Sequence, residues 1–242
     1  MGFTCDVFDL ADKDFSAKRL NRILKSRGIQ GLIEAPMFAG LSEYDIDVSD
    51  MIVVSSNPGL LPQAYHRVCP DHYGNMDMLL RRLYAGGFRR PGLMVPRDLD
   101  ARFNHLWTSR YLAFQQTEKL GKVPLHMPEH TKLFSRERFM KWFDRYRPDV
   151  LIVSNQELFQ DGFFENAGLK IPQDIEVVKI NINDTSPGFS GINMMSDTVG
   201  AGCVKLLSQL LYNNEFGRPE NPMSILLPGR WVSGKMCPRL AD

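Results

Sequence analysis

Short apolar segments alternate with amphipathic helical segments along almost the whole chain, and this order restricts the fold more than any other feature of the sequence. The pattern is clearest from Asn166 to Asn181. Gly168 suits a left-handed cap at the end of a helical run, and Pro172 prevents the helix from resuming. Ile175–Ile180 is then a mostly β-branched apolar run, as expected for a strand covered on both faces. Such helix–turn–strand units predict parallel sheets flanked by helices.

The same patterns place the remaining elements. Apolar runs bounded by turn residues predict strands at Thr4–Asp9, Gly31–Ala35, Met51–Ser55, Pro91–Val95, Pro124–Met127, Val150–Ser154, Ile175–Ile180 and Ser224–Leu227. Amphipathic periodicity predicts helices at Phe15–Arg27, Asp71–Gly86, Arg102–Leu120, Ser135–Tyr146, Glu157–Ala167 and Thr198–Leu211. The expected fold class is therefore α/β, with two doubly wound, mostly parallel sheets whose ligands lie beyond the carboxyl ends of the strands.

Composition excludes several classes of protein. The 242 residues include 29 basic and 28 acidic side chains, so the formal charge of +1 gives no overall footprint for nucleic acid or a membrane surface. No apolar run approaches the roughly 20 residues that span a bilayer. The N-terminus has no basic segment followed by an apolar one, so we expect no secretory signal and a cytoplasmic location.

Four cysteines, Cys5, Cys69, Cys203 and Cys237, are widely scattered and form no CxxC pair. They are expected to be free thiols, mostly buried, and a zinc site is not expected. The motifs of serine hydrolases, P-loop proteins, zinc proteases and dinucleotide-binding enzymes are all missing from the sequence. We therefore expect no catalysis, no cofactor and no metal.

The stretch Asn166–Asn181 resembles the "G-L-x-I-P-x-D-hydrophobic" junction of the lac repressor/galactose repressor (LacI/GalR) family of transcriptional regulators. Further segments resemble that family in the same order along the chain, namely Arg27–Pro36, Leu83–Pro96, Trp107–Phe114, Pro148–Gln156 and Leu226–Pro238. The chain departs from the family pattern at its start. It shows no helix-turn-helix headpiece and none of the strand–helix unit that follows the headpiece in the family.

This resemblance implies a fold of the type I periplasmic-binding-protein class, with an N-terminal lobe that lacks its first strand and helix. The expected lobes are residues 1–88 with 195–221, and residues 89–194 with 222–242. The implied function is effector sensing: a small polar ligand, a carbohydrate or a derivative, binds between the lobes. Binding would then control operator DNA through a headpiece outside this chain, in a homodimer. The alternative from another class is a transport-type sugar-binding protein, which shares the fold.

Four polar residues match family positions at the effector site. Arg110 can donate a bidentate pair of hydrogen bonds to a ligand, or it can form a salt bridge at the site, or it can be a surface arginine. Asn155 and Gln156 end a predicted buried strand and suit a hydroxyl-rich ligand, although Asn155 can also cap a helix. Asn181 stands where the family has an aspartate, so the family's carboxylate grip on sugar hydroxyls is in doubt.

Other candidates come from two connections between strands and helices. Phe103, Trp107 and Tyr73 could stack on a sugar ring, with core packing as the alternative. Asn104 lies at the helix entry that contacts effectors in the family, and Asp71 either borders the site or caps the following helix. Weaker candidates are His72, His105, Met194 and Ser196.

Overall fold

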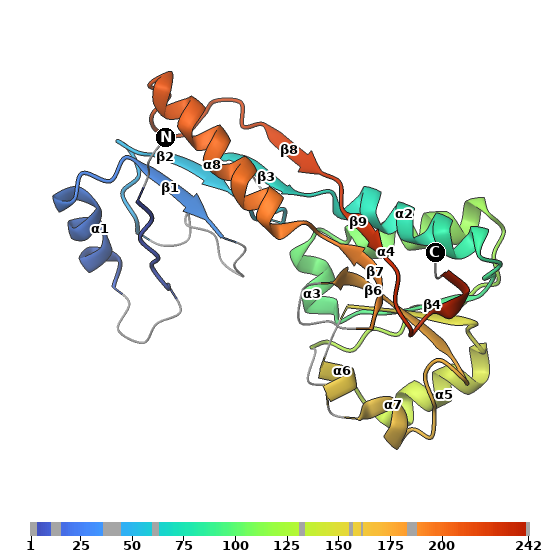
Figure 1. The fold of residues 1–242 in the computed structure, drawn as a ribbon. Coiled ribbons are helices and arrows are strands. Elements are labelled where there is room, and N and C mark those ends of the chain that lie inside the picture. The colour runs from blue at the N-terminus through green and yellow to red at the C-terminus, as the bar shows by residue number, and fades with distance from the viewer. Residues whose placement is uncertain are drawn as a thin grey trace. The chain divides into compact units, whose positions relative to one another are not determined.

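The computed structural model describes residues 4–10, 16–35, 45–59, 63–130, 134–154, 157–160, 162–182 and 188–240. The chain divides into two compact units. Unit 1 comprises residues 1–69 and 200–225, and unit 2 comprises residues 70–199 and 226–242. Each unit is built on one α/β sheet (Figure 1). The chain therefore has the α/β class, with parallel strands predominating, that its alternating pattern predicts.

Unit 1 is organised by a four-stranded sheet with the order β1-β2-β3-β8. The strands are β1 (Gly31–Glu34), β2 (Ile52–Ser55), β3 (His66–Pro70) and β8 (Ser224–Leu227), and the helices are α1 (Ala17–Ser26) and α8 (Ser196–Tyr212). Leu20 and Leu24 of α1 pack with Val53 in one apolar cluster. Gly31 leaves room for the side chain of Leu207, because a Cβ at Gly31 would lie 3.0 Å from it.

Unit 2 is organised by a five-stranded sheet with the order β4-β5-β6-β7-β9, in which only β9 runs antiparallel to its neighbour. Its strands are β4 (Pro91–Met94), β5 (Val150–Val153), β6 (Glu176–Ile182), β7 (Ser190–Asn193) and β9 (Arg230–Val232). Its helices are α2 (His72–Ala85), α3 (Arg97–Arg102), α4 (Leu106–Thr117), α5 (Arg136–Tyr146), α6 (Glu157–Gln160), α7 (Phe163–Asn166) and a final 3-10 turn, Pro238–Leu240.

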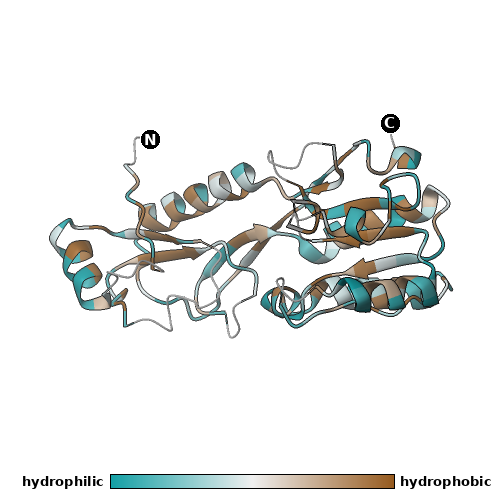
Figure 2. Cartoon of the chain, turned by 90° about the horizontal axis from the view of Figure 1, so that it is seen from below, coloured by the Kyte–Doolittle hydropathy of each residue, from teal (hydrophilic) through white to brown (hydrophobic). Residues whose placement is uncertain are grey.

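Helices cover both faces of the unit 2 sheet, which explains why its strand β5 is apolar at every position. Val150 and Ile152 of β5 face the cluster that contains α2 and α4. Leu151 and Val153 face the cluster that contains α5 and α7. Because successive side chains in a strand point to opposite faces, a strand between two helical layers favours apolar residues at every position. In Figure 2 the strands include brown, hydrophobic stretches, whereas the helices carry more hydrophilic residues.

Several predicted elements are wrong in detail. Thr4–Asp9 forms no strand, and Pro124–Met127 contributes only an isolated bridge between Met94 and His126. The predicted helix Arg102–Leu120 is broken at Phe103–His105, and Glu157–Ala167 is divided into α6 and α7. The sequence reading also missed three strands, β3, β7 and β9. These are short, and they contain polar residues, proline or glycine at positions where a strand signal needs apolar ones.

The unit boundary also differs from the predicted lobe boundary after residue 88. Helix α2 belongs to unit 2, because it packs mainly against α4 and also contacts β6 and β7. Gly168 adopts the expected left-handed conformation, with φ of +76°, and the amide of Leu169 donates to the carbonyl of Phe164 at 2.9 Å. All four cysteines are free thiols, and Cys5 alone is exposed. Among the described residues, no helix is long and apolar enough to cross a membrane.

Candidate functional site

Three rings of unit 2 meet at the start of α2 and the entry to α4. His72 stacks on Phe103, with ring centroids 4.2 Å apart, and meets Trp107 edge-on at 5.5 Å. Phe103 and Trp107 lie 4.6 Å apart, so the three rings form one group, called here the ring cluster. The structure thus brings together two of the predicted aromatic residues and adds His72 to them.

The ring cluster carries polar atoms that the protein leaves unused. His72 is 6% exposed and Trp107 is 2% exposed. Neither His72 Nδ1 nor Trp107 Nε1 has a hydrogen-bond partner within the described part of the chain. Burial lowers the pKa of His72 from 6.5 to about 4, so its imidazole is neutral at pH 7. Buried polar atoms are nearly always paired, so two such atoms in one cluster indicate a place where a polar group can bind.

A strained turn connects α3 to α4 beside these rings. Asn104 and His105 both have positive φ, 51° and 58°, a conformation that costs roughly 1–3 kcal/mol for a residue other than glycine. The turn is held by the buried carboxylate of Asp100. That carboxylate accepts hydrogen bonds from Thr108 Oγ1 at 2.7 Å and, when Nδ1 carries the proton, from His105 Nδ1 at 2.8 Å. Asp100 therefore fixes where Phe103 and Asn104 lie.

Arg110 forms an ion pair inside unit 2. Its Nε donates to Asp77 Oδ1 at 2.8 Å, and its Nη2 donates to the same oxygen. The guanidinium also lies 5.7 Å from the ring centroid of Tyr73 and 5.1 Å from that of Phe114. Of the interpretations offered by the sequence, the structure matches the salt bridge.

Asp77 is shared between two arginines. Its Oδ2 accepts a hydrogen bond from Arg81 Nε at 2.8 Å, one turn further along α2. Burial alone would raise the pKa of Asp77, but hydrogen bonds from Arg81 and Arg110 and their positive charges hold it below its ordinary value. Asp77 is therefore ionised at neutral pH, and it offsets the charge of Arg110.

The other predicted residues are not gathered with the ring cluster by any described contact. Asp71 caps α2, since its Oδ1 accepts from the amide of Gly74 at 2.8 Å, and this supports the capping interpretation. Asn181 is exposed on β6. Asn155 and Gln156 lie outside the described residues. Met194 is buried and accepts a hydrogen bond from Asn75, whereas Ser196 is exposed.

Sequence reasoning missed a polar cluster at the carboxyl edge of the unit 1 sheet. Glu34 and Ser55 end the neighbouring strands β1 and β2 in register, and the hydroxyl of Ser55 donates to the Glu34 carboxylate. The amide of Asn57 donates to Ser55 Oγ at 3.1 Å, and all three residues are buried. A signal was present, because Glu34 is the next-to-last residue of one predicted strand and Ser55 is the last residue of the other.

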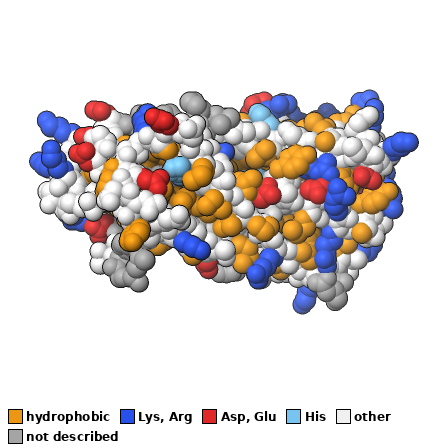
Figure 3. All heavy atoms as spheres, turned by 90° about the horizontal axis from the view of Figure 1, so that it is seen from above, with side chains coloured by type: hydrophobic (Ala, Val, Ile, Leu, Met, Phe, Trp, Pro, Cys, Tyr) orange, Lys and Arg blue, Asp and Glu red, His pale blue; other side chains and the backbone are white. Residues whose placement is uncertain are grey.

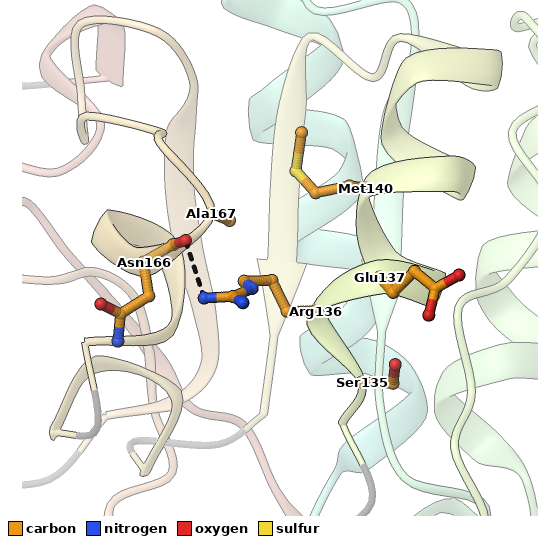
Figure 4. A pocket seen from close by; sticks show the side chains of 6 residues that line it. All are labelled: Ser135, Arg136, Glu137, Met140, Asn166 and Ala167. Carbon is orange, nitrogen blue, oxygen red and sulfur yellow. Dashed lines mark hydrogen bonds between the residues drawn. The ribbon is translucent and has the colours of Figure 1, made fainter.

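A surface pocket of about 540 Å³ lies elsewhere in unit 2, between the start of α5 and the end of α7. In Figure 4 the side chain of Arg136 extends from α5 toward α7, where it donates to the carbonyl of Asn166 at 3.1 Å. Ser135, Glu137, Met140 and Ala167 complete its lining. None of the predicted site residues belongs to it, so its size alone does not make it the site.

Neither surface charge nor metal-binding residues point to a further candidate site in the described part of the chain. Basic, acidic and apolar side chains are mixed on the face shown in Figure 3, in keeping with the formal charge of +1. Among the described residues, no group of three or more histidine, cysteine or acidic side chains could hold a metal ion. The chemistry available in the ring cluster is therefore hydrogen bonding and ring stacking.

A family model described as "Periplasmic binding protein-like domain" matches residues 80–235. The chain belongs to this family. The match includes Phe103, Trp107 and Arg110 of the periplasmic binding protein-like domain and most of unit 2. No curated protein matches the chain.

Solved structures show the same fold at low identity. The periplasmic binding protein/LacI transcriptional regulator of Alkaliphilus metalliredigens QYMF, complexed with D-xylulofuranose, is 16% identical, with a TM-score of 0.65 over 91% of this chain and 82% of that one. The regulator CcpA of Lactococcus lactis is 14% identical, with a TM-score of 0.66 over 91% and 83% of the two chains. The transcriptional regulator CelR in complex with cellobiose is 15% identical, with a TM-score of 0.63 over 91% and 69%. These likenesses establish the type I periplasmic-binding-protein-like α/β fold.

Proposed function

We propose that this chain is the effector-sensing domain of a LacI/GalR-like transcriptional regulator that binds a small polar ligand of the carbohydrate class. The observation that carries the proposal is the shared fold: similar structures cover about nine-tenths of this chain and are named as transcriptional regulators, two of them in complexes with sugars. Because these similar structures are named as transcriptional regulators, we favour a sensing function for this chain over a transport or catalytic function.

The ring cluster is the part of the ligand site that unit 2 supplies in this proposal. Phe103 and Trp107 offer aromatic rings, on which the apolar face of a sugar can stack. His72 Nδ1 and Trp107 Nε1 offer hydrogen-bonding capacity that no described residue uses. A few convergent polar groups among aromatic side chains are typical of small-molecule sites. Arg110, Asn104, Tyr73, Asp71, Asn155, Gln156 and Asn181 remain proposed site residues.

Regulation follows from the same proposal. Ligand binding would shift a pre-existing equilibrium between conformations of the sensing domain, and a headpiece would transmit that shift to operator DNA. The working form would be a cytoplasmic homodimer. Light scattering tests the dimer directly, because a dimer has twice the 27.6 kDa mass of the chain.

A thermal-shift screen with neutral sugars, sugar acids and sugar phosphates tests ligand binding. A ligand present at one hundred times its Kd stabilises the folded state by about 2.7 kcal/mol. For a domain of this size that corresponds to a rise in Tm of about 5–10 °C. A well-folded sample that shows no shift with any compound contradicts the proposed function.

A further inference from the structure

Arg110 is the one strong cation among the proposed ligand-binding residues, and its charge is already paired with the carboxylate of Asp77. Two hydrogen bonds run from its guanidinium to the same oxygen of Asp77. Its side chain is only 10% exposed, against 28% for Asp77. Tyr73 and Phe114 also lie against the guanidinium, so its orientation is fixed from several directions.

Asp77 is in turn held firmly in place. Its second oxygen accepts a hydrogen bond from Arg81. The side chain of Arg81 is 63% exposed, so water solvates the positive charge of Arg81. An anionic ligand would have to displace the carboxylate of Asp77 from Arg110, and Asp77 is part of the same folded unit and already bonded to Arg110. A protein that reads a carboxylate or a phosphate through an arginine needs the opposite arrangement, with the bidentate donors free.

The three rings of the ring cluster are uncharged, and the guanidinium of Arg102 lies 6.0 Å from the ring centroid of Phe103. His72 is a neutral imidazole at pH 7, and Phe103 and Trp107 carry no charge. The buried Asp100 carboxylate is bound by Thr108 and by His105. Trp107 Nε1 can only donate, whereas a neutral imidazole has one donor and one acceptor nitrogen. A hydroxyl group both donates and accepts, so it matches such a pair, whereas an anion only accepts.

We propose that the ligand site of unit 2 selects an uncharged, hydroxyl-bearing compound, and that Asp77 is a specificity-determining residue because it withholds Arg110 from anionic ligands. This inference rests on the proposed effector-sensing function and names the chemical class of the effector. It departs from the sequence expectation that Arg110 itself binds the ligand.

The test compares matched neutral and anionic sugars on the full 242-residue chain. The pairs are D-glucose with D-glucuronate and glucose 6-phosphate, and D-xylulose with xylulose 5-phosphate; cellobiose is added as a neutral disaccharide. Thermal shift identifies a binding pair, and calorimetry then gives the two Kd values. We expect the neutral member to bind at least tenfold more tightly than its anionic counterpart.

Asp77→Asn tests the role of Asp77 itself. The amide keeps the shape of the side chain but removes the charge that holds Arg110, so the preference for the neutral ligand should fall by about tenfold or more. Asp144→Asn is the matched control, because it makes the same change in an ion pair with Arg147, at 3.3 Å, at the end of α5. Arg81→Gln removes only the outer partner of Asp77. Both controls should retain the preference of the unchanged chain.

Three results would overturn the inference. Tighter binding of the anionic member by the unchanged chain would refute the neutral class while leaving the proposed function intact. In that case Arg102→Gln would show whether Arg102, whose guanidinium lies 6.0 Å from the ring centroid of Phe103, reads the anion. An unchanged preference in a folded Asp77→Asn variant would remove Asp77 from the selection. A folded chain that binds no compound in the panel would refute the proposed function, and this inference with it.

Discussion

The two units hold polar side chains in opposite ways. At the carboxyl edge of the unit 1 sheet, Glu34, Ser55 and Asn57 are buried and bonded to one another, so their polar atoms serve the fold of unit 1 itself. In unit 2, His72 and Trp107 are equally buried, but each keeps a ring nitrogen without a described partner.

This difference distinguishes polar groups that stabilise a fold from polar groups that are available to a ligand. A buried hydrogen-bonded group contributes to stability, and removing its partner exposes the full cost of its desolvation. A buried polar group without a partner loses its hydration without compensation, so replacing it with an apolar group of similar shape should cost little. The four predictions below test this contrast, beginning with the largest expected effect.

Two substitutions of Trp107 should distinguish the contribution of its aromatic ring to stability from the contribution of its indole nitrogen. Trp107→Ala leaves a large cavity in the core of unit 2 and should lower the free energy of unfolding by about 3–5 kcal/mol. Trp107→Phe keeps an aromatic ring and removes Nε1, which no described residue binds, so it should cost much less. Urea unfolding measures both values. Equal losses in the two variants would mean that the nitrogen stabilises the fold.

Acid should weaken unit 2 through His72. The pKa of His72 is about 4 in the folded chain because burial disfavours the charged form, and the ordinary value is 6.5. The unfolded state therefore binds the proton first as the pH falls, and stability is lost between pH 6.5 and about 4. The slope from this one group is at most about 1.4 kcal/mol per pH unit.

His72→Phe should flatten that dependence, because phenylalanine keeps the stacked ring and removes the titrating group. His130→Phe is the control, since it removes an imidazole that is 67% exposed. Urea unfolding at several pH values between 4 and 7 gives the slopes. A slope that is the same in His72→Phe and in the unchanged chain would contradict the assignment.

The sequence was sufficient to predict the alternation of strands and helices and the positions of most of them, because apolar runs and amphipathic helices are local patterns. It failed where a distant partner decides the structure. It also missed a local break: the predicted helix Arg102–Leu120 is interrupted at Phe103–His105, where the carboxylate of Asp100 accepts from Thr108 across the turn. Strand β9 forms only because β7 is available to pair with it.

The candidate site shows the same limit. Resemblance identified Arg110 as a residue of interest, but the single chain gave no reason to connect it with Asp77, 33 positions earlier. For Asp71 the sequence offered both a place at the site and a capping role, and the structure confirms the capping role, which depends on residues within one turn. The sequence identifies Phe103 and Trp107 as rings that could stack on a ligand, whereas the contribution of His72 depends on burial, which only the packed structure supplies.

Ser55 tests the other half of the contrast, in unit 1. Ser55→Ala removes the hydroxyl that donates to the buried Glu34 and accepts from the amide of Asn57. Unpairing buried groups should lower the free energy of unfolding by about 1–3 kcal/mol. Ser208→Ala removes a hydroxyl whose hydrogen bond among the described residues goes to the carbonyl of Val204 on α8, so it should change the free energy of unfolding by no more than about 0.5 kcal/mol. Equal effects in the two variants would mean that the unit 1 cluster does not serve the fold.

The smallest effect concerns the helix caps, where the two units also differ. Asp71 in unit 2 binds the amide of Gly74, whereas Ser16 at the start of α1 in unit 1 makes no capping hydrogen bond with its side chain. Asp71→Ala should therefore cost about 1 kcal/mol, and Ser16→Ala should cost almost nothing. Urea unfolding of both variants against the unchanged chain measures the difference. A different result would contradict the capping role: Asp71→Ala leaves stability unchanged but weakens ligand binding. In that case Asp71 would contribute to the ligand site, like the ring cluster, and its hydrogen bond to Gly74 would not stabilise α2.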